Sequence, residues 1–226
     1  MFRVALALVM TGVVAPPALA QDWMPWNQPG YRTPSYSSPS PRFDEDRYGP
    51  RPRPQGQELM SGGPRPDVSP ASPSRASFES SYAPGTIVID TGARRLYLVQ
   101  SSRHALVYPI SVGREGFTWT GTERISRVAN WPDWHPPAEM RQRQPHLPVK
   151  MTGGVYNPLG AKALYLGNTL YRIHGTDDAR TIGRATSSGC FRMTNGHVTD
   201  LSRRVGVGTT VVVVNRLSAR TARVDD

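Results

Sequence analysis

The sequence predicts a mainly β domain with one or two short helices, preceded by a disordered tether. Between residues 84 and 216, short runs of β-branched and aromatic residues alternate with turn residues, which is typical of strands. One amphipathic helical pattern lies near the end of this region. Proline, serine, glycine and arginine instead dominate residues 21–83. We therefore expect one folded domain at 84–216, with a short C-terminal tail at 217–226.

Residues 1–20 have the features of a secretory signal peptide. Arg3 provides a positive start, an apolar stretch follows from Val4 to Val14, and Ala18-Leu19-Ala20 is a small-x-small cleavage signal. An uncleaved membrane anchor is the alternative, but the apolar stretch is shorter than the roughly 20 residues that cross a bilayer. We expect export to the periplasm or cell wall.

Residues 21–83 show no apolar repeat with the period of a strand or a helix. Such a stretch cannot bury enough apolar surface to offset the entropy lost on ordering, so we expect a disordered tether. A proline-rich segment that binds a partner is the alternative, although no specific motif supports it.

Six strands are expected in the domain, at residues 86–90, 95–99, 105–112, 164–166, 171–174 and 210–214. The turn Thr91-Gly92-Ala93 joins the first two strands into a hairpin. Pro109 cannot donate to a ladder, so the third strand is expected to be bent or at an edge. Residues 210–214 form a solid β-branched run, which predicts a buried strand.

One helix is expected before the last strand, capped by Thr194 or Asn195 and ended by Gly206. Its apolar residues share one face at helical spacing: Val198, Leu201 and Val205. Residues 113–162 are instead rich in glycine, proline, tryptophan and histidine. A loop of this length forms either a lid over a cleft or a packed connector. Within it, Trp134 is a candidate substrate-binding residue.

The positive charge of the chain is concentrated in the domain and its tail. The net charge is +10, and residues 84–226 hold nineteen lysines and arginines against ten acidic residues. A basic exported domain suits a polyanionic or carboxylate-bearing substrate, and general solubility explains the charge equally well. The export signal and the lack of a nucleic-acid motif argue against a nucleic-acid partner.

Cys190 is the only cysteine of the chain, and the pair His174-Gly175 precedes it. One cysteine cannot close an internal disulfide, so the thiol is either idle or reactive. A neighbouring imidazolium would lower the thiol pKa and create a nucleophilic thiolate. A structural role for each residue is the alternative. One cysteine with His174 and His197 makes a poor zinc site, so no metal or cofactor is expected.

These residues resemble the catalytic domain of the L,D-transpeptidases of bacterial cell walls, the YkuD or ErfK/YbiS-type family. The family pattern is His-Gly, a gap, then Ser/Thr-x-Gly-Cys, an apolar residue, Arg and often Met-x-Asn. Here the chain reads Ile173-His174-Gly175-Thr176 and then Ser187-Ser188-Gly189-Cys190-Phe191-Arg192-Met193-Thr194-Asn195. The resemblance covers residues 84–216, includes weaker matches at 84–90 and 157–160, and implies a β-sandwich-like fold.

The resemblance also implies roles for these residues. Cys190 would be the acyl-forming nucleophile, His174 its base, and the Gly175 carbonyl would orient the imidazole. The backbone amides of Ser188, Gly189 and Cys190 would form the oxyanion site.

The resemblance leaves the side-chain roles of two positions open. The commonest form of the motif has histidine where this chain has Ser188, so any side-chain role there is lost while the amide remains. Arg192 would either pair with a substrate carboxylate or brace the loop.

The function that this resemblance implies is cross-linking of peptidoglycan. The enzyme would cleave the L,D amide bond of a tetrapeptide stem and form a 3→3 cross-link, or attach an outer-membrane lipoprotein, and carbapenems would acylate it. No cofactor is required, and a monomer suffices. Two alternatives remain open: an L,D-carboxypeptidase or peptidase that uses water as acceptor, and a wall-binding module without turnover.

Overall fold

The computed structural model describes residues 59–218 and 221–224. The predicted signal peptide and most of the predicted tether, residues 1–58, lie outside the described residues. Among the helices of the described part, none is long and apolar enough to cross a membrane.

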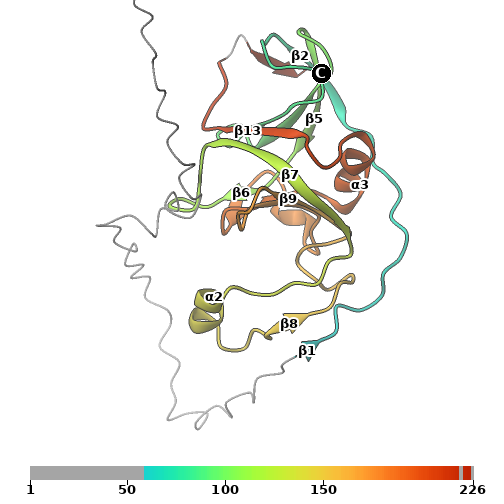
Figure 1. The fold of residues 1–226 in the computed structure, drawn as a ribbon, viewed down its shortest axis with the longest axis vertical. Coiled ribbons are helices and arrows are strands. Elements are labelled where there is room, and N and C mark those ends of the chain that lie inside the picture. Colours follow the sequence, from blue (N-terminus) through green and yellow to red (C-terminus); the bar gives the residue numbers. More distant parts are fainter. Residues whose placement is uncertain (1–58, 219–220, 225–226) are drawn as a thin grey trace, which may run out of the picture. The chain divides into compact units, whose positions relative to one another are not determined.

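A ten-stranded sheet dominates the described chain (Figure 1). Its strands follow the order β12-β10-β9-β7-β13-β3-β4-β5-β2-β14. Their bounds are β2 (Ser74–Phe78), β3 (Ile87–Asp90), β4 (Arg95–Val99), β5 (His104–Pro109), β7 (Gly121–Asn130), β9 (Lys162–Leu166), β10 (Arg172–His174), β12 (Phe191–Arg192), β13 (Thr210–Val214) and β14 (Ala222–Val224). The prediction of a mainly β domain is confirmed.

Smaller elements complete the described fold. The parallel pair β1 (Leu59–Met60) and β8 (Lys150–Met151) forms one small sheet, and β6 (Val112–Gly113) with β11 (Ala185–Ser187) forms another. The α-helices are α2 (Ala138–Arg143) and α3 (Asn195–Arg204), and Ala179–Thr181 forms a short 3₁₀ helix, η2.

Successive side chains of the central strands point to opposite faces of the sheet, which creates two apolar layers. Ile87 and Ile89 of β3 face the larger core cluster, whereas Val88 between them faces a smaller one. The larger cluster also contains residues from β9, β10 and α3, such as Leu164, Ile173 and Leu201. Because strands far apart in the sheet order share one core, the sheet curves around it, which gives a sandwich-like arrangement.

Helix α3 is held against the sheet by a buried polar group. Tyr108 of β5 is fully buried, and its hydroxyl donates to Asp200 Oδ2 over 2.8 Å. Arg204 donates two further bonds to the same carboxylate, at 2.8 and 2.9 Å. Thr194 caps the helix by accepting from the backbone N–H of His197, as predicted.

Both ends of the domain extend further than the sequence predicts. The predicted tether (21–83) is ordered over 59–83, where β2 pairs with β5 and buries Ala76 and Phe78. The predicted tail (217–226) contributes β14, which pairs with β2. A five-residue alternating strand is hard to recognise in a proline-rich segment, because most of its neighbours are polar.

Three further predictions need correction. Residues 113–162 are more regular than a loop, since they contain β7, α2 and β8. Strand β7 buries only Ile125 fully, so no apolar alternation marks it in the sequence. Strand β5 is internal rather than at an edge, and it ends at Pro109. Strand β13 is buried on alternate residues rather than throughout.

Candidate active site

Strands β10 and β12 bring the His-Gly and Gly-Cys motifs together. They pair in parallel, with Ile173 opposite Phe191 and His174 opposite Arg192. Ile173 and Phe191 both enter the larger core cluster, so His174 and Arg192 face the other side. Cys190 comes immediately before β12 and two residues before Arg192. If the strand alternation is continued by one residue, Cys190 lies on the same face as Arg192 and His174.

The spacing of strands sets the separation of the two groups. Neighbouring strands lie about 4.8 Å apart and two residues advance about 6.6 Å, which places the Cα atoms of His174 and Cys190 about 8 Å apart. Diagonal neighbours on one face of a sheet at about this separation are within reach of an aromatic or long side chain. The same two guanidinium groups, of Arg172 and Arg192, act electrostatically on both the imidazole and the thiol. The two motifs therefore share one local environment.

The Cys190 thiol is reachable but not strongly ionised. The residue is half-buried, and its Sγ lies 3.7 Å from the Leu170 carbonyl in a solvent-exposed contact. Burial raises the pKa of the thiol above its ordinary value, while the Arg172 guanidinium, hydrogen bonds from Arg172 and the charge of Arg192 act against this rise. The pKa of the thiol is raised overall, so the sulfur is protonated at neutral pH.

His174 is almost completely buried, with 4% of its surface exposed. Its Nδ1 lies 2.6 Å from the Gly175 carbonyl oxygen, the group that the family resemblance implies would orient the ring. Burial, together with the nearby charges of Arg192 and Arg172, lowers the pKa of His174 to about 3, although the backbone carbonyls of Gly175 and Leu159 act in the opposite direction. The imidazole is therefore neutral at physiological pH, with its Nδ1 proton donated to Gly175.

These pKa directions disagree with the expectation of a thiolate–imidazolium pair. Both Cys190 and His174 are shifted toward their neutral forms, and burial is the largest cause in each case. The two guanidiniums favour a thiolate but oppose an imidazolium. The resting site is thus a neutral thiol beside a neutral imidazole, and a sequence alone does not reveal such desolvation.

The loop before Cys190 has the tight turn that its glycine predicts. Gly189 adopts a φ of +107°, and a side chain there would meet the Tyr171 ring at 2.8 Å. The Ser187 hydroxyl donates to the Cys190 carbonyl over 2.6 Å and accepts from the Gly189 amide over 3.2 Å. Of the three amides proposed for the oxyanion site, that of Gly189 therefore already has an internal partner, and Ser188 is exposed.

The approach to the sulfur is formed by residues that sequence reasoning missed. Tyr171 stacks on Trp119 with ring centroids 4.6 Å apart, and Trp119 also packs against Phe191. Leu170, beside the sulfur, is 53% exposed. Trp119 supports the packed-connector alternative for residues 113–162, because it contacts the larger core cluster.

The two predicted substrate-binding residues have different surroundings. Trp134 forms backbone hydrogen bonds with Met151 of β8, so it belongs to the neighbourhood of the small β1–β8 sheet. Arg192 bonds Ser111 through its backbone in both directions. Within the described residues its guanidinium forms no hydrogen bond or ion pair, although its charge helps to lower the pKa of Asp178.

Arg172 is a further site residue that the sequence analysis did not identify. It precedes His174 by two residues on β10 and therefore lies on the same face. Its guanidinium also lies 5.1 Å from the centre of the Tyr165 ring. The signal available in the sequence was the alternation of side chains along the strand around His174, which puts Arg172 on the same face as His174.

Comparison with known proteins gives a consistent match over this domain. The family profile described as the L,D-transpeptidase catalytic domain (YkuD) matches residues 84–213. "Probable L,D-transpeptidase YbiS" of Escherichia coli (strain K12) is 36% identical over 138 residues, which is 57% of this chain and 44% of the relative. A Fuscovulum blasticum protein from the ATP synthase subunits region, also named for this family, is 35% identical over 62% of this chain and 74% of its own length. The match with YbiS thus spans less than half of that relative.

Two crystal structures are also similar to this chain. L,D-transpeptidase 3 from Mycobacterium tuberculosis is 13% identical over 57% of this chain and 60% of its own, with a TM-score of 0.45. A Brucella melitensis protein described as "a Probable carnitine operon oxidoreductase caia" is 46% identical over 62% of this chain and 91% of its own, with a TM-score of 0.42.

Proposed function

The chain belongs to the L,D-transpeptidase (YkuD) family, and from this membership we propose that it is an exported peptidoglycan L,D-transpeptidase that acts through a Cys190 acyl-enzyme. The observation that supports the proposal is the parallel β10–β12 pair, in which His174 lies opposite Arg192, together with the charges of Arg172 and Arg192, which act on both the His174 imidazole and the Cys190 thiol. The substrate would be a tetrapeptide stem, and the bond cleaved would be the L,D amide after its third residue.

The first half-reaction forms a thioester. His174, neutral because it is buried, accepts the Cys190 proton as the sulfur attacks the carbonyl carbon of the L,D amide. The oxygen of this carbonyl becomes negative and is held by backbone amides at Ser188 and Cys190. The C–N bond then breaks, His174 returns the proton to the leaving nitrogen, and D-alanine departs.

The second half-reaction transfers the acyl group. The side-chain amine of a second stem attacks the thioester carbonyl, His174 removes a proton from this amine, and the sulfur leaves as a thiol after the proton is returned to it. The products are a 3→3 cross-link and the free enzyme. An outer-membrane lipoprotein amine would follow the same steps, and water would give a shortened monomer.

A neutral resting pair is compatible with this chemistry. Proton transfer then occurs together with attack, so no ion pair has to persist in a partly buried site. The Arg172 and Arg192 charges stabilise the negative charge that develops on sulfur and oxygen. The Arg192 guanidinium, which forms no hydrogen bond or ion pair among the described residues, is also suited to the carboxylate of the stem.

Incubation of the purified chain with a disaccharide-tetrapeptide tests the proposal. Mass spectrometry is expected to show an acyl adduct on Cys190, loss of D-alanine and cross-linked dimers, whereas Cys190→Ala gives none of these. Shortened monomers without dimers would replace the transferase assignment by a carboxypeptidase. Absence of both an adduct and D-alanine release from a folded chain would rule out the proposed activity, and acylation by a carbapenem provides an independent check of the nucleophile.

A further inference from the structure

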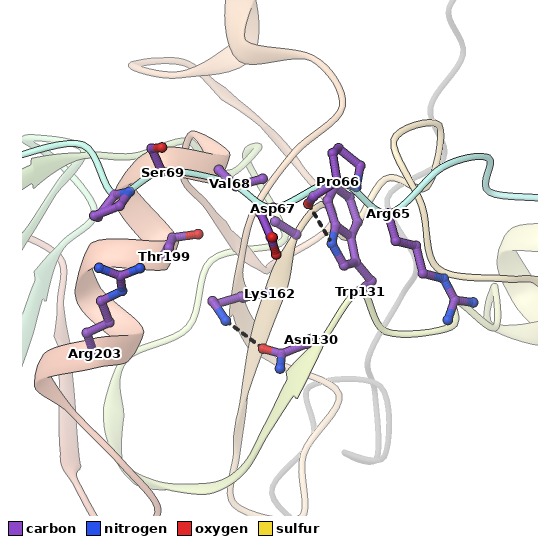
Figure 2. Close-up of a pocket in the computed structure, with 12 residues that line it drawn as sticks. Arg65, Pro66, Asp67, Val68, Ser69, Asn130, Trp131, Lys162, Thr199 and Arg203 are labelled. Carbon is purple, nitrogen blue, oxygen red and sulfur yellow. Dashed lines mark hydrogen bonds between the residues drawn. The ribbon is translucent and has the colours of Figure 1, made fainter.

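A pocket of about 470 Å³ lies between α3 and an N-terminal strap (Figure 2). We call residues 59–73 the strap. Residues 65–70 of the strap form one wall, and the end of β7, the start of β9 and the outer side of α3 form the other. The lining contains neither His174 nor Cys190, so this pocket is not the site described above.

The strap is fastened on both sides of the pocket. On one side, the Trp131 indole N–H donates to the Pro66 carbonyl over 3.2 Å, and Arg65 donates to the Gly153 carbonyl over 2.9 Å. On the other side, the Ala71 amide donates to the Gly196 carbonyl over 3.0 Å. The wall of the pocket is therefore a defined part of the fold, although it precedes the region matched by the family profile.

The pocket contains a buried hydroxyl without a partner. Thr199 is 3% exposed, and its Oγ1 has no hydrogen-bond partner in the described part of the chain. The hydroxyl of a threonine in a helix can bond a carbonyl of the preceding turn. Here the hydroxyl points away from α3 into the pocket (Figure 2). A buried polar atom of this kind is costly unless a ligand or solvent satisfies it.

Charges of both signs surround this hydroxyl. Lys162 Nζ donates to Asn130 Oδ1 over 2.6 Å, and an ammonium group has two more protons to donate. Among the described residues, Arg203 and Asp67 form no ion pair with any side chain. In Figure 2, Asp67 and Lys162 extend into the pocket from opposite walls. One wall thus offers a carboxylate, and the other offers two cations and a hydroxyl.

We propose that this pocket binds a zwitterionic ligand, an amino acid or a peptide end that carries both a carboxylate and an ammonium group. The ligand carboxylate accepts from Lys162, Arg203 and the Thr199 hydroxyl, and its ammonium donates to Asp67. A simple anion would use the cations but would face Asp67 unfavourably. The volume lies within the range of small-molecule sites, about 300–1,000 Å³, and accommodates a short peptide.

The test uses the indole N–H of Trp131 as a local reporter, because this group forms part of the pocket wall. The chain has five tryptophans, so its indole signals are resolved by NMR and assigned with Trp131→Phe. Titration with alanyl-alanine is expected to shift the Trp131 signal to saturation. Three controls each lack one of the two charged groups: N-acetylalanine and inorganic phosphate have no ammonium group, and alaninamide has no carboxylate. Each is expected to bind at least about tenfold more weakly than alanyl-alanine.

Substitutions separate the contributions of the charges. Thr199→Val keeps the shape of the side chain and is expected to weaken alanyl-alanine binding while the melting temperature stays equal or rises. Asp67→Asn is expected to weaken the dipeptide and to strengthen phosphate. Arg103→Ala removes an exposed arginine outside the pocket lining and is the matched control, with no expected change.

Three results would overturn the inference. Phosphate binding as tight as that of alanyl-alanine, or a gain of dipeptide affinity in Asp67→Asn, would identify an anion site instead. A Trp131 signal that does not saturate at millimolar dipeptide would show an empty polar cavity. Turnover of the tetrapeptide substrate is expected to be the same in these variants, so this test is independent of the proposed catalytic function.

Discussion

At the scale of single residues, protonation of His174 controls the proposed chemistry. Only the neutral imidazole accepts the thiol proton, and burial lowers the pKa of His174 to about 3. A lowered pKa means that the base remains neutral as pH falls through 6.5, the ordinary histidine value. We expect kcat/KM for the tetrapeptide to hold steady from neutral pH down to about 5. An acid limb centred near 6.5 in the measured pH profile would contradict this assignment.

Arg172 is expected to tune the thiol. Its charge and hydrogen bonds oppose the rise in the pKa of Cys190 caused by burial, so Arg172→Gln should raise this pKa further. Because thiolate is the alkylated species, iodoacetamide should modify the variant about tenfold more slowly at neutral pH.

Arg127→Gln is the matched control for Arg172→Gln. Arg127 lies 3.7 Å from the centre of the same Tyr165 ring, but it is not among the groups that shift the pKa of Cys190. Equal slowing of alkylation in both variants would show that the effect comes from general charge rather than from contact with the sulfur.

At the scale of elements, the position of α3 depends on the Tyr108–Asp200–Arg204 group. Tyr108→Phe removes a buried 2.8 Å hydrogen bond to a carboxylate, which should lower the free energy of unfolding by about 1–3 kcal/mol. Urea unfolding at neutral pH measures this loss. Arg204→Ala serves as the comparison, because its bonds to Asp200 are partly exposed and should contribute less. A larger loss in Arg204→Ala would contradict this account of α3.

Elements with a strong local signal were predictable from the sequence, and those without it were not. The hairpin of β3 and β4 and the cap and stripe of α3 follow from turn residues and periodicity, and the structure confirms them. Strand β7 has little buried apolar surface, and β2 lies in a polar segment, so pairing with distant strands decides both. The motif located His174 and Cys190, but their neutral state depends on burial, which no spacing reveals.

At the scale of the whole molecule, the folded unit begins before the region shared with the family. The family profile starts at residue 84, whereas β2 adds Ser74–Phe78 to the sheet and buries Phe78 completely. We expect a chain that starts at residue 59 to unfold cooperatively and one that starts at residue 84 to be insoluble or to melt at a much lower temperature. Thermal unfolding followed by circular dichroism measures the difference.

A substitution tests the same point without truncation. Phe78→Ala in the full chain should cost about 3–5 kcal/mol, because it opens a cavity beside the Tyr97 ring, whose centroid lies 5.0 Å away. If the chain from residue 84 melted like the longer one and Phe78→Ala changed nothing, the N-terminal strand would be dispensable.

The protonated state of Cys190 has a consequence for the lifetime of the protein. Peroxide and other oxidants attack thiolates far faster than thiols, and they convert them to sulfenic and then irreversible sulfinic acids. A sulfur that gives up its proton only as it attacks an acyl donor spends little time in the vulnerable form. In the proposed mechanism, desolvation of this single side chain would therefore preserve the nucleophile between turnovers in an oxidising compartment.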